Sequence, residues 1–187
     1  MDSDALTETR LAGHAIAGTR FLDVRRDTVR LPSGREGERE YIVHPGAVLV
    51  LPLLDDGRLV LERQFRYPLK QVFIELPAGK IDPNEAPLIT GQRELLEETG
   101  YQASEWIHLG AFHPCIGYSD EIIHVYLARG LQAGQHQRDC DEALELFEAA
   151  LEDCLAMVQR GEITDGKTII ALYWLEKFLQ GRWLPQA

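Results

Sequence analysis

The sequence predicts an α/β fold, in which an α/β/α sandwich with a mixed sheet follows a small N-terminal β-sheet module. Short segments that alternate apolar and polar residues recur along much of the chain, as strands do. One segment between them, from about residue 87 to residue 99, repeats its apolar residues with the period of a helix. Two further helical segments lie near the C-terminus. Helices interleaved with strands favour helical layers on a sheet.

Length and composition fit one main domain with an appendage. The chain has 187 residues, of which 45% are hydrophobic, and this content is typical of a globular protein with a buried core. We predict a β module over residues 1–44 and the main domain over residues 45–187.

Charge and cysteine content argue against several protein classes. The formal net charge of -11 disfavours a protein that binds a nucleic acid polymer through its phosphates. The three cysteines are odd in number and form no C-x-x-C pair, which favours a reducing compartment. The N-terminus has no basic region followed by an apolar core, and no apolar run reaches the length of a membrane span. We therefore predict a soluble cytoplasmic protein without a membrane partner.

The N-terminal module should consist mainly of a hairpin. Residues 1 to about 12 are polar, and we expect them to be loosely held. From Phe21 the pattern alternates, which predicts a strand, a turn at residues 32–34 and a return strand from about Arg39 to His44.

Turn residues also organise the next segment. Residues 45–46, Pro-Gly, separate the module from two apolar runs that flank Asp-Gly at residues 56–57, a strong hairpin signal. A short buried strand over residues 72–76 should then lead into the Pro-Ala-Gly loop at residues 77–79.

The helix predicted from Pro87 to Thr99 has two distinct faces. Proline is acceptable in a first helical turn, and Gly100 suits the left-handed position after the last turn. At 100° per residue, four apolar residues fall on one side of this helix: Leu88, Ile89, Leu95 and Leu96. Three carboxylates share the other side: Glu94, Glu97 and Glu98.

This acidic face needs a counter-charge. Glu94 and Glu98 form a like-charge pair one turn apart, which costs the helix about 0.2–0.5 kcal/mol. Glu85 can add a fourth carboxylate, and Arg93 is the nearby cation. A hard divalent cation such as Mg²⁺ would resolve the repulsion, and Gly91 should leave that face open. The alternative is an acidic helix face that is merely solvated.

The chain after this helix predicts strands, an acidic loop and two helices. Residues 105–112 and 121–128 read as strands, and an acidic cluster of Asp139, Asp141 and Glu142 precedes an alternating segment over residues 143–147. Leu151, Leu155 and Val158 give the first helix an apolar stripe that ends at residues 160–161. Thr164 or Asp165 can cap the second helix, over residues 166–179. Its inward residues should be Ile169, Leu172, Leu175 and Leu179, with Trp174 and Phe178 serving packing.

The stretch from Gly79 to Tyr101 resembles the Nudix box, G-x5-E-x7-R-E-U-x-E-E-x-G-U, where U is a bulky apolar residue. The matching positions are Gly79, Glu85, Arg93, Glu94, Leu95, Glu97, Glu98 and Gly100. Tyr101 is an aromatic at the last position, similar to the variant in the ADP-ribose pyrophosphatase branch.

The resemblance implies a Nudix fold and a metal-dependent hydrolase that cleaves the diphosphate of ADP-ribose to AMP and ribose 5-phosphate. Glu94, Glu97, Glu98 and the backbone carbonyl of Ala78 would hold Mg²⁺ or Mn²⁺. The ions neutralise the diphosphate and lower the pKa of a water molecule. Arg93 would orient the carboxylates through Glu85.

Glu142 would take the proton from that water, because it stands where the branch has its proposed base. Asp139 and Asp141 remain open as rivals for this role, and the alternative for all three is a solvated acidic loop.

Further residues carry the resemblance to the ADP-ribose pyrophosphatase branch. Arg66 matches an arginine that holds the substrate's diphosphate or terminal ribose. Pro114, Gly117 and Ser119 resemble the branch's proline-bearing loop, although Cys115 and Ile116 replace its serine and proline. In this branch a similar N-terminal sheet takes part in dimerisation and closes the partner's substrate site, so a homodimer is expected. Each of these three features also has a purely structural interpretation. Arg66 could be a surface arginine, the proline-bearing loop a simple turn, and the N-terminal sheet a hairpin that packs on its own domain.

Three rival functions remain. The substrate could be another nucleotide sugar or a dinucleotide. The protein could be a non-catalytic nucleotide sensor, although the complete set of box carboxylates disfavours this. It could also be an interaction protein with a purely structural cation site.

Overall fold

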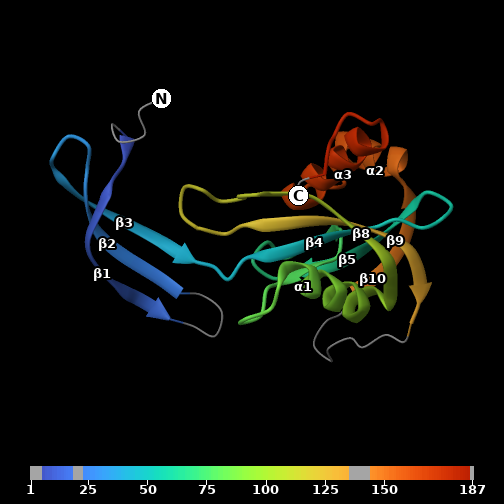
Figure 1. The fold of residues 1–187 in the computed structure, drawn as a ribbon, viewed down its shortest axis with the longest axis horizontal. Coiled ribbons are helices and arrows are strands. Elements are labelled where there is room, and N and C mark those ends of the chain that lie inside the picture. The colour runs from blue at the N-terminus through green and yellow to red at the C-terminus, as the bar shows by residue number, and fades with distance from the viewer. Residues whose placement is uncertain (1–5, 19–22, 135–143, 186–187) are drawn as a thin grey trace. The chain divides into compact units, whose positions relative to one another are not determined.

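The structure, a computed structural model, describes three stretches of the chain: residues 6–18, 23–134 and 144–185 (Figure 1). Contacts divide the chain into two compact units. The smaller unit comprises Met1–Pro45 and Cys115–Ile122, and the larger comprises Gly46–Pro114 and Ile123–Ala187. No helix among the described residues is long and apolar enough to cross a membrane.

The smaller unit contains an antiparallel sheet in the order β1-β2-β3. Its strands are β1 (Thr9–Gly18), β2 (Asp23–Arg30) and β3 (Glu36–Val43). The predicted strand, turn and return strand are thus present, and Gly34 in the turn has a φ of 82°. The prediction that residues up to about 12 are loosely held was wrong for residues 9–12. They continue a strand that pairs with β2, where Arg10 Nε donates to Asp27 Oδ2 at 2.7 Å.

Residues 115–122 belong to the smaller unit because they pair with the end of β3. Ile42 N donates to the carbonyl of Tyr118 at 2.8 Å, and Asp120 N donates to the carbonyl of Ile42 at 3.3 Å. His44 N also donates to Asp120 Oδ1 at 2.7 Å. This pairing could not be predicted from local patterns, since its two partners are far apart in the chain.

The larger unit contains two sheets. A mixed sheet has the order β7-β4-β9-β8, in which β4 runs parallel to β9 and antiparallel to β7. Its strands are β4 (Ala47–Pro52), β7 (Ala78–Lys80), β8 (Tyr101–Phe112) and β9 (Ile123–Ala133). An antiparallel sheet has the order β10-β5-β6. Its strands are β5 (Arg58–Arg66), β6 (Gln71–Glu75) and β10 (Leu144–Ala150).

The hairpin predicted around residues 56–57 was wrong, although the turn itself is present. Gly57 has a φ of 88°, and Leu54 N donates to the carbonyl of Arg58 at 2.9 Å. After one bridge between Leu53 and Leu59, however, β4 and β5 enter different sheets. Side chains on both faces of β4 are buried, so β4 is an interior strand, and β7 and β9 occupy its two edges.

Helices cover both faces of the mixed sheet, which confirms the α/β/α sandwich (Figure 1). Val48 and Val50 of β4 pack in one cluster with Leu95. Leu49 and Leu51 point the other way, into the main core. This core also contains residues of the two C-terminal helices, α2 (Leu151–Gln159) and α3 (Gly166–Leu179).

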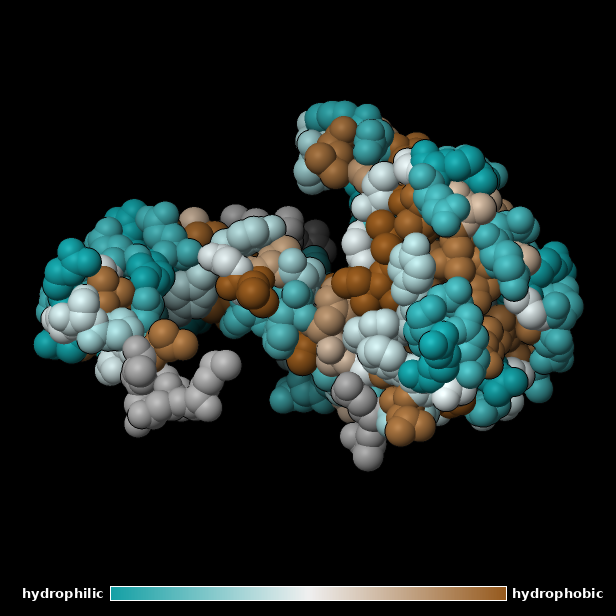
Figure 2. All heavy atoms as spheres, turned by 90° about the horizontal axis from the view of Figure 1, so that it is seen from above, coloured by the Kyte–Doolittle hydropathy of each residue, from teal (hydrophilic) through white to brown (hydrophobic). Residues whose placement is uncertain are grey.

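On the face seen in Figure 2, hydrophilic residues surround smaller areas of hydrophobic residues.

The C-terminal helices follow the prediction except in the last turn of α3. Asp165 caps α3, because its Oδ2 accepts from Thr168 N at 3.0 Å. Leu172 and Leu175 are fully buried, but Leu179 in the last turn is 52% exposed, against the prediction. Trp174 serves packing, as predicted, since it stacks on Trp183 with 4.8 Å between ring centroids.

The strand predicted to be buried over residues 72–76 is only partly so. Val72 is 59% exposed, whereas Glu75 and Leu76 are buried. Burial therefore increases along β6 toward the loop that carries Ala78 and Gly79.

Candidate active site

The helix that carries the clustered carboxylates runs from Pro87 to Thr99, as predicted, but in two forms. It starts as α1 (Pro87–Glu94) and continues as a π-helical segment, η2 (Leu95–Thr99). Gly100 ends it in the left-handed conformation, with a φ of 74°. A π turn has wider spacing than an α turn, so the side-chain directions of residues 95–99 depart from a wheel drawn at 100° per residue.

The face that this helix buries differs from the prediction. Leu95 is fully buried, but Ile89 is 51% exposed and Glu98 is only 4% exposed. Gly91 does not open the acidic face, because it lies against the sheet. A Cβ built on Gly91 would lie 3.2 Å from Val48 Cγ1. Glu98 and Glu94 therefore border the protein interior, whereas the Glu97 side chain is 37% exposed.

Glu94 and Glu98 both reach strand β7. Glu98 Oε2 accepts a hydrogen bond from Ala78 N at 3.0 Å. The Glu94 carboxylate lies directly against Gly79, where a built Cβ would come within 1.8 Å of Glu94 Oε1. The two carboxylates of the like-charge pair thus meet the same short strand, on adjacent residues.

Arg93 connects the remaining carboxylates. Its Nε and Nη2 donate to the two oxygens of Glu85 at 3.1 and 3.0 Å. Its Nη1 donates to Glu94 Oε1 at 2.7 Å and to Glu97 Oε2 at 3.0 Å. Nη2 also donates to the carbonyl of Lys80 at 3.1 Å. One guanidinium thus binds three carboxylates, those of Glu85, Glu94 and Glu97.

These contacts shift the pKa of both partners. Hydrogen bonding to Arg93 lowers the pKa of Glu85 to about 2, against a smaller opposing effect of burial. Thr90 Oγ1 also donates to Glu85 Oε2, at 2.7 Å. The pKa of Arg93 is raised, chiefly by the hydrogen bond with Glu85. Glu85 is therefore ionised at neutral pH and serves as an anchor for Arg93.

The donor chemistry at β7 fits a hard divalent cation. Glu94, Glu97 and Glu98 supply carboxylate oxygens, which Mg²⁺ and Mn²⁺ prefer, and no side chain at Gly79 separates Glu94 from the strand. Within the described ranges, no three His, Cys, Asp or Glu side chains converge on one point. Arg93 holds Glu94 and Glu97, so an ion that bound them all would have to replace some of these hydrogen bonds.

Comparisons with known proteins agree with this geometry. The model of the NUDIX domain matches residues 43–170. The chain belongs to the Nudix family. The model of the nucleoside diphosphate sugar hydrolase N-terminal domain matches residues 8–42.

Relatives of this Nudix protein cover nearly all of its chain. It is 40% identical to an ADP-ribose pyrophosphatase of Bacillus subtilis over 174 residues, 92% of this chain and 94% of the relative. It is 37% identical to a methanol dehydrogenase activator of Bacillus methanolicus over 171 residues, 90% of this chain and 92% of the relative. A crystal structure of an ADP compounds hydrolase has the same fold, with a TM-score of 0.85 at 22% identity, covering 95% of this chain and 97% of that one.

As a Nudix hydrolase, the protein is an enzyme of the pyrophosphohydrolase class and depends on divalent metal ions. Two of the box carboxylates, those of Glu94 and Glu98, contact β7 in the structure. Glu97 lies on the same helix and is linked to Glu94 through Arg93.

Arg66 lies at the end of β5 and forms a two-pronged ion pair with Glu75. Its Nε and Nη2 donate to the two carboxylate oxygens at 2.7 and 2.8 Å. Sequence reasoning missed Glu75, which is only 2% exposed. The sequence does contain a clue, since Glu75 is a single charge at the end of an apolar strand. A carboxylate buried there requires a cationic partner.

The other predicted substrate residues fall in different units. Pro114 belongs to the larger unit, and Gly117 and Ser119 belong to the smaller one. Ser119 Oγ accepts from Glu121 N at 3.2 Å, which shapes the local turn. Glu142 and its rivals Asp139 and Asp141 lie outside the described residues.

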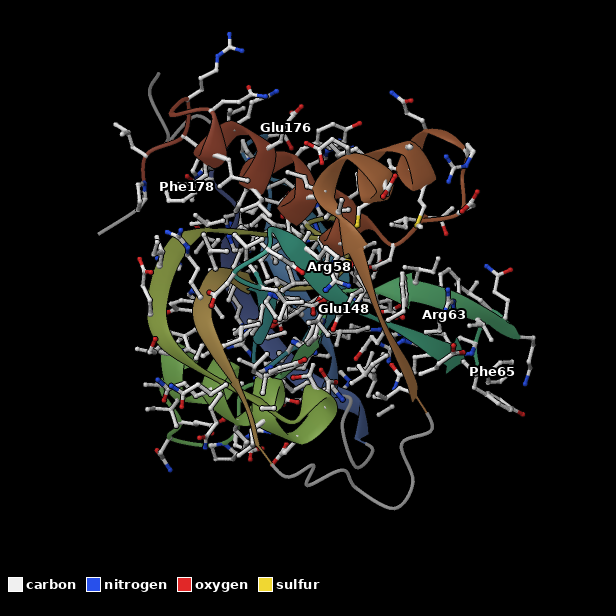
Figure 3. The ribbon with its side chains drawn as sticks, turned by 90° about the vertical axis from the view of Figure 1, so that its right-hand side faces the viewer. Arg58, Arg63, Phe65, Glu148, Glu176 and Phe178 are labelled. Atoms are coloured by element: carbon white, nitrogen blue, oxygen red, sulfur yellow. The ribbon has the colours of Figure 1, made fainter. Side chains whose placement is uncertain are left out.

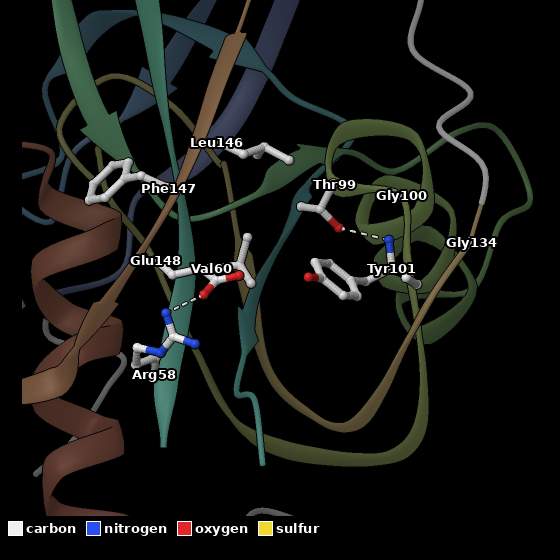
Figure 4. A pocket seen from close by; sticks show the side chains of 10 residues that line it. Arg58, Val60, Thr99, Gly100, Tyr101, Gly134, Leu146, Phe147 and Glu148 are labelled. Carbon is white, nitrogen blue, oxygen red and sulfur yellow. Dashed lines mark hydrogen bonds and ion pairs between the residues drawn. The ribbon is translucent and has the colours of Figure 1, made fainter. Parts of the chain in front are cut away.

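A cavity of about 490 Å³ lies between the two sheets of the Nudix domain (Figure 4). Tyr101 and Phe147 line it, together with Arg58, which pairs with Glu148 at 2.5 Å. No carboxylate of the box lines this cavity. The cavity is therefore distinct from the carboxylate cluster at β7, although the helix end at Thr99 borders it.

Proposed function

We propose that this Nudix hydrolase cleaves the diphosphate of ADP-ribose, with AMP and ribose 5-phosphate as products. The observation that carries the proposal is the meeting of the box carboxylates at β7, where Glu98 binds Ala78 N and Glu94 lies against Gly79. The similarity to an ADP-ribose pyrophosphatase over nearly the whole chain supports the choice of substrate.

Glu94, Glu97, Glu98 and the carbonyl of Ala78 are the groups that we assign to Mg²⁺ or Mn²⁺. When bound, the metal neutralises diphosphate charge and makes a water more acidic. Arg93 binds Glu97 and also Glu94, which lies against the strand, and Glu85 in turn fixes Arg93. We assign the general base to Glu142, which takes a proton from the attacking water.

Arg66 is the group that we assign to the substrate's diphosphate or terminal ribose, with Pro114, Gly117 and Ser119 as further substrate-binding residues. A guanidinium suits this role because its planar donors match phosphate oxygens. The Arg66 side chain is 41% exposed while Glu75 holds one edge of it, which supports the assignment.

A second candidate is hydrolysis of another nucleoside diphosphate sugar or of a dinucleotide. The match of residues 8–42 to the nucleoside diphosphate sugar hydrolase N-terminal domain favours the first of these. A non-catalytic sensor fits less well, because such a protein has no need for a complete set of box carboxylates.

A substrate panel tests the proposal. The purified enzyme with Mg²⁺ is given ADP-ribose, other nucleotide sugars, dinucleotides and free nucleoside triphosphates, and the products are separated by chromatography. We expect AMP from ADP-ribose and little hydrolysis of triphosphates. A clear preference for dATP or GTP would overturn the assignment, and the absence of any turnover would favour the sensor.

We further propose that residues 1–44 form a dimerisation module in a cytoplasmic homodimer. All ten residues of β1 are exposed, and three-stranded sheets need a covered face for stability. The free thiols of Cys115 and Cys154 support a reducing compartment. Light scattering coupled to size exclusion should give the mass of two chains, and removal of residues 1–44 should give a monomer. A monomeric full-length chain at micromolar concentration would contradict the proposal.

A further inference from the structure

Glu75 is a buried carboxylate between two cations from distant parts of the larger unit. It ends β6 and is 2% exposed. Arg66 of β5 donates hydrogen bonds to both of its carboxylate oxygens, from Nε at 2.7 Å and from Nη2 at 2.8 Å. Lys167 in the first turn of α3 pairs with Glu75 Oε2 and also donates to Asp165 Oδ2 at 3.0 Å. Glu75 thus joins β5, β6 and α3 in one polar network.

The network keeps Glu75 charged in spite of its burial. Burial by itself would raise the pKa of Glu75, but the hydrogen bond from Arg66 and the charge of Lys167 outweigh it, so the pKa is lowered. The pKa of Arg66 is raised, chiefly by the hydrogen bond with Glu75. Glu62, which lies opposite Glu75 on β5 and is 1% exposed, contributes further negative charge near Arg66. Arg66 and Glu75 therefore stay paired at neutral pH.

The geometry leaves part of the Arg66 guanidinium available. Glu75 engages Nε and Nη2, and among the described residues the Arg66 guanidinium has no hydrogen bond to any other group. Arg66, Glu75 and Lys167 line one cavity of about 300 Å³. The donors of Nη1 are thus presented on a guanidinium whose plane is already fixed by a buried carboxylate.

We propose that Glu75 is the positioning residue for Arg66: its two-pronged grip orients the guanidinium so that the unengaged edge meets the substrate's diphosphate. The inference rests on the proposed function insofar as Arg66 contacts the substrate. Lys167 braces Glu75 from the other side, which ties the start of α3 to the same site.

The physical advantage lies in conformational entropy. A free arginine side chain loses much rotamer freedom when it binds a ligand, and an anchored one has already lost it on folding. Removal of the anchor should therefore weaken substrate binding and leave the chemical step nearly unchanged. This is the signature of lost ground-state binding, in which KM rises at constant kcat.

Kinetics of single and double variants test the coupling. Glu75→Gln should raise KM for ADP-ribose about tenfold, with kcat changed by less than about threefold. In an Arg66→Met background, Glu75→Gln should raise KM no further, because the group that Glu75 positions is gone. Additive effects in the double variant would overturn the proposal. If Glu75→Gln does not fold, Glu75→Asp replaces it: it keeps the charge that Lys167 needs, shortens the reach to Arg66, and should raise KM to a smaller extent.

A measurement without substrate separates this inference from the proposed function. The Nε–Hε NMR signal of Arg66, assigned by its loss in Arg66→Met, should exchange slowly with water in the wild type and fast in Glu75→Gln. Failure of the whole substrate panel would reject the proposed function, yet the NMR signal would still report on the anchor. Unchanged exchange in Glu75→Gln would reject the anchor, whatever the enzyme hydrolyses.

Glu145→Gln provides the matched control. Glu145 of β10 also pairs with an arginine of β5, since Arg63 Nη1 donates to its Oε1 at 3.1 Å. Strand alternation places this pair on the opposite face of β5 from Arg66. Figure 3 shows Arg63 near the end of the strand pair that extends away from α2 and α3. Glu145→Gln should change neither KM nor the Arg66 signal, and a tenfold rise in KM here would show that the kinetic effect is not specific to Glu75.

Discussion

Glu94 lies so close to Gly79 that position 79 has no room for a side chain. A Cβ at Gly79 would come within 1.8 Å of Glu94 Oε1 and within 2.4 Å of Oε2. Real Cβ atoms do not approach oxygen this closely, so any other residue at position 79 must displace the carboxylate. The glycine that opens the Nudix box is thus explained by the approach of a glutamate that lies further along the same motif.

Gly79→Ala should displace Glu94 and lower kcat/KM by about 100-fold, since a shift of about 1 Å in a catalytic group can cost that much. It should also destabilise the fold by about 1–3 kcal/mol, as overpacking does. Steady-state kinetics and urea unfolding measure the two effects. Gly18→Ala is the control, because a Cβ there meets nothing within 4 Å and should leave kinetics unchanged. Full activity in Gly79→Ala would show that Glu94 has no fixed role.

Activity should vanish in excess chelator and return with Mg²⁺ or Mn²⁺. Glu94→Gln and Glu98→Gln keep the side-chain shape but remove charge, so each should weaken metal affinity at least about tenfold and lower the rate in parallel. Metal titration followed by calorimetry gives the affinity, and circular dichroism checks the fold. Hydrolysis that persists undiminished in chelator would reject the metal-dependent mechanism, and a normal Glu98→Gln enzyme would remove that residue from the metal site.

The stability contributed by Glu85 should be lost only in strong acid. Its pKa falls from 4.5 in the unfolded chain to about 2 in the folded protein, chiefly through the hydrogen bond from Arg93. A depressed pKa stabilises the fold above the unfolded value, and this stabilisation disappears as pH falls from about 4.5 to about 2.

Glu85→Gln should therefore reduce the free energy of unfolding at pH 7 by about 1.5–3 kcal/mol, the scale of a hydrogen bond to a charged group. The difference in free energy of unfolding between wild type and variant should become smaller as the pH falls below 4.5. Urea unfolding at a series of pH values measures it. A gap that stays constant down to pH 2.5 would mean that the Glu85 charge does not stabilise the fold.

Glu142→Gln should lower kcat by about 10²–10⁴-fold, the usual contribution of a positioned general base. KM and metal affinity should change little, because proton transfer matters mainly in the transition state. Asp139→Asn and Asp141→Asn are the matched comparisons and should have smaller effects. A near-normal Glu142→Gln with a collapsed neighbour would move the base to that neighbour, and normal rates in all three would exclude this loop as its source.

Features that depend on spacing along the chain could be predicted from the sequence. Pro87 and Gly100 bracket the helix in the structure as they do in the sequence, and Asp165 caps α3. Most strands and helices also followed from local patterns, although β1 and β7 were not predicted. Residues within a few turns of one another are held together by the covalent chain, so their relation survives without knowledge of the remaining fold.

Contacts between distant segments became visible only in the folded chain. The turn at residues 56–57 was predicted, but β5 does not pair with β4 beyond one bridge. The two edges of β4 are occupied by β7 and β9, and β5 belongs to another sheet. The π turn and the close packing of Gly91 turned Glu98 inward, which a wheel could not show. Glu75 reaches Arg66 across a hairpin and Lys167 across 92 residues. Such contacts depend on burial and on how strands compete for partners, and these are properties of the assembled fold and not of any local pattern.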